Sequence, residues 1–432
     1  MNVRPQATPR LRVLCIKIAA VAILVALAAA LSPSGLAAAE KQWYKGHTHC
    51  HSLWSDGDQF PELVLDWYKS RGYDFACLSD HNVLMEDARW YPLNHEKRPV
   101  TPKMLDQCRG RFGEGWLELR GEGDGREVRL KTYEEIRKTL EEPGKFLMIQ
   151  AEEVTGKCKQ KEVHVNAINL VELVEPRTER TVIETIQADL AAVRRQAEVT
   201  GRRILAHVNH PNWRRYDITA FDLAEAIDVR FFELCNNCHD INNLGDATHP
   251  SSEKLWDIAN TIRLTKLQAP VIFGVGSDDT HHYHVLNPEN ANPGRAWIVV
   301  RAEKLEIEPL LAAMEQGDFY ASTGVVLKDL QWNPDRRTLQ IEVDPKPGVQ
   351  YVIEFVGTTG DADPTGCDTA KIGQVLARHQ GTKAEYQMKD DELYVRAVVR
   401  SDRKLDNPPS NSIDLETAWT QPVGWERFVT NP

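Results

Sequence analysis

Four short segments of this chain end in side chains that bind metal ions, and each follows an apolar run that favours a β-strand. The segments are Gly46-His47-Thr48-His49, Ser79-Asp80-His81, Ala206-His207-Val208-Asn209-His210-Pro211 and Gly276-Ser277-Asp278-Asp279-Thr280-His281. Side chains at the ends of successive strands converge at one mouth of a barrel. Imidazole and carboxylate ligands together suit Zn, Mn or Fe. The sequence therefore predicts a metal-dependent hydrolase that holds more than one ion.

The first two segments and the turn between them supply five candidate residues. His47 and His49 are predicted to chelate one ion together, because alternate residues of a strand lie on the same side. Asp56 follows in a turn and is predicted to add a carboxylate. His81 is the predicted ligand at the next strand end, with Asp80 as a possible neighbour that orients it from behind.

Two further candidates lie on the next predicted strands. Glu153 is predicted to bridge two ions, with Glu152 as the alternative ligand. His164 is a weaker candidate, because a lone strand histidine is more often a satisfied core residue than a ligand. The histidines interpreted as surface or packing residues are His51, His95, His239, His249 and His379. His282 and His284 are interpreted as loop residues or substrate contacts.

The last two segments each leave a choice open. His207 and His210 should point to opposite faces of their strand, and His210 is preferred because the proline after it ends the strand at the mouth. Asp279 and His281 are predicted to bind from one face, with Asp278 as an alternative to Asp279.

Short apolar runs alternate with amphipathic stretches from residue 43 to about residue 300. Predicted strands are Tyr44–His49, Phe75–Ser79, Phe146–Ala151, Val163–Asn169, Ile204–Asn209, Arg230–Leu234 and Val271–Gly276. Predicted helices are Pro61–Ser70, Tyr133–Leu140, Arg180–Thr200, Ser252–Leu267 and Lys304–Glu315, and Gly201 is a predicted helix stop. Alternation of helices with seven strands predicts a parallel α/β barrel.

Two stretches depart from this alternation. Residues 86–131 are rich in Gly, Arg, Glu and Pro, and we interpret them as an insertion that is either a tolerated surface loop or a cap over the site. After residue 325, strand-like runs separated by turn residues predict a small antiparallel, sandwich-like β domain. The predicted domains are thus the barrel, residues 40–325, and the β domain, residues 326–432.

Residues 1–39 have the features of a secretory signal peptide. Four basic residues precede the apolar run Ile18–Leu31, and Ala37-Ala38-Ala39 supplies a cleavage site. The run is shorter than the roughly 20 residues that a membrane span needs. We therefore predict export to the periplasm or medium, with no stable membrane insertion after cleavage.

The charge of the chain is acidic. Removing the four basic residues of the leader would leave 48 Lys and Arg against 63 Asp and Glu. This balance argues against binding to nucleic acid or anionic lipid. The remaining seven cysteines leave at least one thiol free, and Cys108 could pair with Cys158.

Taken together, the segments resemble the polymerase and histidinol phosphatase (PHP) family of metal-dependent phosphoesterases. The matching elements occur in order: His47-x-His49 with Ser55-Asp56-Gly57, Asp80-His81, Glu153, His164, His210-Pro211 and Asp279-x-His281. The leader, the form of the last motif and the ending Thr417–Pro422 look more like an exported, carbaryl-hydrolase-like branch. The resemblance implies a distorted seven-stranded, TIM-like barrel with two or three divalent ions.

These observations predict an exported metal-dependent hydrolase acting on a small-molecule ester through a metal-bound hydroxide. The predicted metal ligands are His47, His49, Asp56, His81, Glu153, His164, His210, Asp279 and His281. A phosphoester is the expected substrate, and a carboxylic or carbamic ester is the alternative. Arg214, Arg215 and Arg295 are candidate phosphate-binding residues. The alternative from another class is a non-catalytic exported binding protein stabilised by metal.

Overall fold

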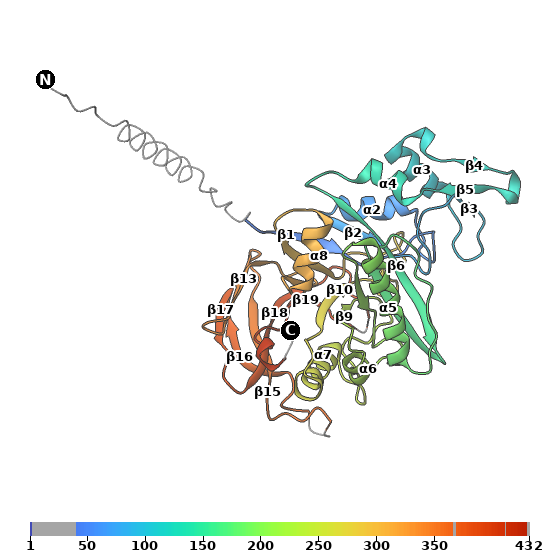
Figure 1. The fold of residues 1–432 in the computed structure, drawn as a ribbon. Helices are drawn as coiled ribbons and strands as arrows, with labels where there is room; N and C mark the ends of the chain where they lie inside the picture. Colours follow the sequence, from blue (N-terminus) through green and yellow to red (C-terminus); the bar gives the residue numbers. More distant parts are fainter. Residues whose placement is uncertain (2–39, 366–368, 411, 430–432) are drawn as a thin grey trace. The chain divides into compact units, whose positions relative to one another are not determined.

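A large mixed sheet organises residues 42–432 in this computed structural model (Figure 1). The structure describes Met1 and residues 40–365, 369–410 and 412–429, so the predicted signal peptide lies almost entirely outside the described residues. Within the described ranges, no helix has the length and apolar character needed to span a bilayer.

The seven predicted strands are all present and are joined in one half of the sheet, in the order β10-β9-β8-β7-β6-β2-β1. They are β1 (Gln42–His47), β2 (Phe75–Leu78), β6 (Leu147–Cys158), β7 (Lys161–Ile168), β8 (Leu205–Val208), β9 (Phe231–Asn236) and β10 (Phe273–Ser277). Between β10 and β1, the described residues show one isolated bridge, Cys50 to Thr280, rather than a ladder. A closed seven-stranded barrel is therefore not shown.

The prediction of an all-parallel arrangement is wrong at β7. This strand runs antiparallel to both β6 and β8, whereas the other neighbours in this half are parallel. Only Lys159 and Gln160 separate β6 from β7, and Lys159 has a φ of 59°. A two-residue connection can join only antiparallel strands, because a parallel pair needs a crossover of a dozen or more residues.

Helices connect most of these strands, and several begin at clear sequence signals. They are α2 (Pro61–Lys69), α4 (Tyr133–Leu140), α5 (Val182–Thr200), α6 (Ala220–Glu225) and α7 (Ser252–Ile262), and a further helix, α8 (Ile307–Glu315), follows later in the chain. Thr181 and Glu184 form a capping box at the start of α5, and Gly201 ends that helix at a φ of 67°, as predicted. The apolar face of α5 packs against β6 and β7 through Ile186 and Leu190 (Figure 1).

The insertion at residues 86–131 has a small sheet of its own. Its strands are β3 (Arg89–Pro92), β5 (Glu127–Leu130) and β4 (Leu119–Arg120), in the order β3-β5-β4, with α3 (Pro102–Phe112) between β3 and β4. Tyr91, Cys108 and Val128 are buried in a core shared with α2. The insertion is therefore packed against the main fold rather than being a free surface loop.

The main sheet continues beyond β1 through antiparallel strands. They are β11 (Trp297–Ala302), β12 (Phe319–Ser322), β19 (Leu415–Thr420), β18 (Glu392–Lys404), β15 (Tyr351–Thr359) and β16 (Gln374–Gln380). A separate antiparallel sheet of β13 (Leu327–Asn333), β14 (Thr338–Val343) and β17 (Lys383–Gln387) shares a core with β15 and β18. The segment after residue 325 is thus β-rich as predicted, while its division from the rest as a domain stays a prediction.

The described cysteines are all free thiols. Cys50, Cys77, Cys108, Cys158, Cys235 and Cys238 are buried, so the suggested Cys108–Cys158 disulfide is not formed. Burial raises the pKa of the Cys235 thiol, which fits a small apolar role in the core.

Candidate metal centre

The candidate ligands lie where strands of the first half of the sheet end or bend. His49 and His51 follow β1, His81 follows β2, and Glu153 and His164 face each other across the β6–β7 hairpin. His210 follows β8, and Asp279 and His281 follow β10. His210 and Asp279 have positive φ values of 26° and 47°, a conformation that costs free energy in a non-glycine residue. Backbone strain at these two strand ends indicates that the positions of the side chains are maintained at the expense of an unstrained backbone.

One group of donor atoms surrounds the space between His49 and His51. Their Nε2 atoms lie 3.2 Å apart. Each is 3.1 Å from Asp279 Oδ1, and Glu153 Oε2 is 3.4 Å from one and 3.3 Å from the other. Ligands that share an ion with bonds of about 2.0–2.1 Å have separations of roughly 3.4 Å in a tetrahedron. These atoms are therefore spaced to share one ion.

A second group lies beside the first on the more exposed side. Asp56 Oδ1 is 3.1 Å from His281 Nε2 and 3.3 Å from His81 Nε2. The ring of His51 stacks between those of His81 and His281, with centroid distances of 4.4 and 4.2 Å. The two groups therefore adjoin at His51, and all four residues have donor atoms within reach of one ion.

Glu153 joins the first group to a third. Its Oε1 lies 3.0 Å from His164 Nδ1 and 3.4 Å from His210 Nε2, while its Oε2 lies 2.8 Å from His81 Nδ1. Asn209 donates a hydrogen bond of 2.8 Å to the same Oε1 and fixes the carboxylate from behind. A carboxylate with imidazoles on both oxygens is in the position of a bridging ligand.

Several of these atoms are buried without hydrogen-bond partners among the described residues. They are Asp56 Oδ1, Glu153 Oε2 and His164 Nε2. Buried polar atoms in folded proteins are nearly always satisfied. Imidazole nitrogens lie close to Asp56 Oδ1 and Glu153 Oε2, but not in hydrogen-bonding geometry. This arrangement is expected when nitrogen and oxygen ligands point at a shared metal ion. The residues present thus fit a divalent metal site.

The charges of the cluster depend on one another. Burial alone would raise the pKa of Glu153, yet His81, His49 and His164 hold it well below its usual range. The pKa of Asp279 is also held low, against burial, by His49 and its neighbours. The carboxylates are therefore ionised, as metal ligands must be.

The imidazoles divide into two kinds. Burial, with His281 and His81 nearby, lowers the pKa of His51 to about 3. Burial opposes charge on His281 as well, but Asp56 raises its pKa to about 9. His51 is accordingly neutral and ready to donate its lone pair, whereas His281 must lose a proton to bind an ion.

Two buried carboxylates position the cluster without joining it. Asp80 accepts hydrogen bonds from the backbone and hydroxyl of Ser52, both at 2.8 Å, and from Ser55 at 2.5 Å, and so holds the turn that carries Asp56. Glu233, on β9, lies 2.7 Å from His49 Nδ1 and accepts the His210 backbone N–H at 2.8 Å. Sequence reasoning missed Glu233, whose place two residues before Cys235 carries no motif.

His47 does not lie with the other predicted ligands. Its ring stacks on Tyr68, with centroids 4.6 Å apart, and its Nε2 is 2.7 Å from Asp278 Oδ1. His51, interpreted from the sequence as a packing residue, instead lies in two of the donor groups. Residues 47, 49 and 51 all share one face by alternation, so the pattern could not show which pair lies at the mouth. The structure ends β1 at His47, which places the pair His49 and His51 beyond the strand end.

Glu152, Asp278 and His207 each lie apart from the donor groups. Glu152 points away from the cluster and accepts the Val174 backbone N–H at 2.9 Å. Asp278 accepts the backbone N–H groups of Gly294 and Arg295, whereas Asp279 faces the histidines. His207 is buried near His49 with neither ring nitrogen hydrogen-bonded to a described residue.

A cavity of about 420 Å³ opens over the cluster. Trp213 forms part of its wall, and Arg98, Lys157 and Arg214 bring positive charge. These cations lie 3.4 Å from Asp56, 3.0 Å from Glu162 and 2.9 Å from Asp240, respectively. Of the three arginines suggested from the sequence, only Arg214 lines this cavity.

No protein-family profile matches the chain, and no curated protein matches it significantly. A two-domain protein from Bacteroides vulgatus, which contains a predicted PHP-like metal-dependent phosphoesterase, is similar in structure with a TM-score of 0.38 and 16% identity, over 89% of this chain and 96% of that one. A protein from Bifidobacterium adolescentis, described provisionally as a metal-dependent phosphoesterase, has a TM-score of 0.28 and 13% identity, over 55% of this chain and 87% of that one. Both TM-scores are below 0.5, so neither likeness supports a conclusion about fold or activity.

The chain is a mixed α/β protein whose described residues gather imidazoles and carboxylates into a cluster that could hold divalent metal. That is the class defined by the geometry.

Proposed function

We propose that this protein is an exported metal-dependent hydrolase of the PHP type that acts on a small phosphoester. The observation that carries the proposal is the Glu153 carboxylate, which has imidazoles within 3.4 Å on both of its oxygens and one oxygen without a hydrogen bond. A structural site for one ion needs only four ligands. Three adjoining donor groups around one bridging carboxylate suit a catalytic centre better.

The proposed ligands are those that the structure brings together. They are His49, His51, Asp56, His81, Glu153, His164, His210, Asp279 and His281. Divalent ions bound there would polarise the scissile ester and lower the pKa of bound water to about 7. Glu233 would accept the Nδ1–H of His49 and so keep this histidine in the tautomer whose Nε2 has a free lone pair for the ion.

The cavity above the cluster favours an anionic substrate. Arg98, Lys157 and Arg214 would turn from their present carboxylate partners toward the phosphoryl oxygens, which Arg and Lys bind well. Trp213 offers an apolar surface for the leaving group. The insertion supplies Arg98, which supports its role as a cap over the site.

The test is hydrolysis of an aryl phosphate and an aryl carboxylic ester by purified protein, as isolated, after chelation, and after return of Zn, Mn or Fe. Metal-dependent turnover of the phosphate supports the proposal. Turnover of the ester alone would assign a carboxylic or carbamic ester hydrolase. A protein that binds metal stoichiometrically yet hydrolyses neither substrate with any ion would favour a binding role and overturn the phosphoesterase proposal.

A further inference from the structure

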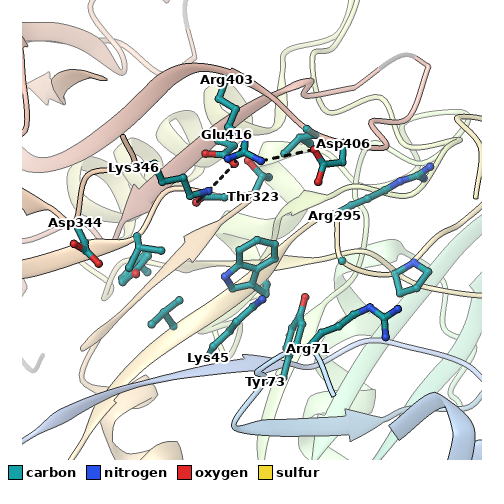
Figure 2. A pocket seen from close by; sticks show the side chains of 18 of the residues that line it. Lys45, Arg71, Tyr73, Arg295, Thr323, Asp344, Lys346, Arg403, Asp406 and Glu416 are labelled. Carbon is teal, nitrogen blue, oxygen red and sulfur yellow. Dashed lines mark hydrogen bonds and ion pairs between the residues drawn. The ribbon is translucent and has the colours of Figure 1, made fainter. Parts of the chain in front are cut away.

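A second cavity, of about 920 Å³, lies where β1 and β11 meet the C-terminal strands (Figure 2). It shares no lining residue with the cavity over the metal cluster. Its size is near the upper end of the roughly 300–1,000 Å³ of small-molecule sites. The two cavities can therefore hold different ligands.

Five aromatic side chains line this cavity. They are Trp43, Trp67, Tyr73, Trp297 and Tyr320. The three tryptophans are only partly buried, so part of each indole remains open. Tyr320 packs edge-on against Trp43 at a centroid distance of 5.2 Å, and Tyr73 packs likewise against Trp297 at 6.1 Å. These contacts hold two of the indoles rigidly, as a ligand platform requires.

Two cations lie on the aromatic rings. Lys45 Nζ is 3.8 Å from the ring centroid of Tyr73 and 3.9 Å from that of Trp297, and the Arg71 guanidinium is 4.1 Å from that of Trp67. No ion pair joins either cation to a carboxylate among the described residues. Aromatic faces thus hold both cations in the cavity wall, where Arg71 also donates to the Trp67 carbonyl and to Ser70 Oγ, both at 3.3 Å. Burial lowers the pKa of Lys45 to about 8, although Asp278 and Asp74 favour its charged form, and an anion bound beside it would favour that form further.

The opposite side of the cavity also has an excess of positive charge. Lys346 and Arg403 share one carboxylate, that of Glu416, at 2.7 and 3.4 Å, and Arg403 is also 3.8 Å from Asp406 (Figure 2). Arg295 is held by backbone carbonyls, including that of Asn407 at 2.7 Å. In all, six Lys or Arg and four Asp or Glu line the cavity of a chain whose formal net charge is −11.

We propose that this cavity binds an acidic carbohydrate, a uronic acid or a short oligosaccharide that contains one. The apolar face of a pyranose ring would lie on the exposed indole surface, where dispersion contacts accumulate. Its carboxylate would reach Lys45 and Arg71. Ring hydroxyls would meet the carboxylates of Asp344 and Glu416.

Ligands of other classes fit less well. A neutral sugar would bring no anion to a cavity whose lining has six Lys or Arg against four Asp or Glu, and a specific site favours ligands that pair with its charged groups. A purely apolar ligand would desolvate the charged lining without compensating contacts. Nucleic acid would meet the strongly acidic remainder of the chain.

The test is calorimetric titration of the full-length mature protein with trigalacturonic acid and, separately, with a neutral galactose trisaccharide and with benzoate. We expect the acidic trisaccharide to bind at least tenfold more tightly than either. Equal affinity for the neutral trisaccharide would show that the cavity does not select an acidic ligand. Tighter binding of benzoate would show that it does not select a carbohydrate. Failure of the acid to bind would remove the proposal.

Variants locate the binding. Lys45→Met and Arg71→Gln should each weaken binding of the acid at least tenfold, while Arg194→Gln, which removes a cation of α5 that pairs with Asp228 and does not line the cavity, should leave it unchanged. Arg71 is exposed, so its variant tests the proposal even if Lys45→Met does not fold. His49→Ala, in the metal cluster, should bind the acid as wild type does. Unchanged binding by Arg71→Gln and Lys45→Met would place the ligand elsewhere.

Discussion

Glu152 and Glu153 are consecutive buried residues of β6, yet on the two faces of the strand one carboxyl group favours the neutral form and the other is ionised. On the inner face, the histidines around Glu153 hold its pKa well below its usual range. On the outer face, burial raises the pKa of Glu152 to about 8, and among the residues that the structure describes only the Val174 N–H donates to it. Asp189 of α5 is a further buried carboxyl on that side, and burial raises its pKa to about 7. Burial therefore does not decide the charge of a carboxyl group; the partners that share its space do.

The largest effect is expected from removing charge on the inner face. Glu153→Gln keeps the shape of the side chain but leaves the surrounding imidazoles without their shared anion. We expect loss of bound metal by elemental analysis and a fall in kcat of about 10³-fold or more. Glu152→Gln is the matched control one residue away and should keep both the bound metal and the wild-type kcat. Full metal content and turnover in Glu153→Gln would contradict the bridging role.

His51 and His47 offer the next contrast, since they occupy one face of the same segment. His51→Ala should weaken metal affinity more than about 100-fold, because changes outside the ligand set already cost about 10–100-fold. His47→Ala should instead cost about 1–3 kcal/mol of stability, because it removes one buried contact of Asp278 and the ring that stacks on Tyr68. Metal titration and urea unfolding of the two variants separate these effects. The reverse pattern would restore His47 as a ligand.

A smaller effect is expected at Glu233, which touches a ligand rather than an ion. Glu233→Gln should weaken metal affinity about 10–100-fold, because the carboxylate that orients His49 becomes an amide. Competition with a fluorescent chelator measures the change. An affinity within twofold of wild type would show that His49 is oriented by other contacts.

The mildest change concerns the outer face and should appear only in stability. A carboxyl group whose pKa is raised from 4.5 to about 8 in the folded state binds more protons there than when unfolded. Stability should therefore fall as pH rises from about 4.5 to about 8, by an amount on the order of a few kcal/mol.

Glu152→Gln removes this contribution and should flatten the profile of unfolding free energy in urea between pH 5 and pH 8. Asp189 keeps a residual slope below about pH 7, so the flattening should be clearest between pH 7 and pH 8. An unchanged slope there would show that the Glu152 carboxyl group is not neutral in the folded protein.

Much of the scaffold could be predicted from the sequence because each strand is an apolar run between turn residues or helices. The direction of β7 could not, since Lys159 and Gln160 carry no glycine, asparagine or aspartate to signal a tight turn. The prediction of His47 and His49, rather than His49 and His51, as ligands was wrong because alternation shows which residues share a face of the strand. It does not show how far along the chain the strand ends. The second cavity was unforeseen because its lining comes from segments between residues 43 and 416.

The β6–β7 hairpin also has a consequence for how the site assembles. Glu153 and His164 are separated by only 11 positions, whereas His51 and Asp279 are 228 apart. Contacts that are close in sequence form with little loss of chain entropy, and distant ones form late. The Glu153–His164 pair can therefore form while the rest of the chain is still folding. The ion-binding centre would be completed only when the segment after β10 returns to the segment after β1, so metal retention reports whether this half of the sheet has assembled.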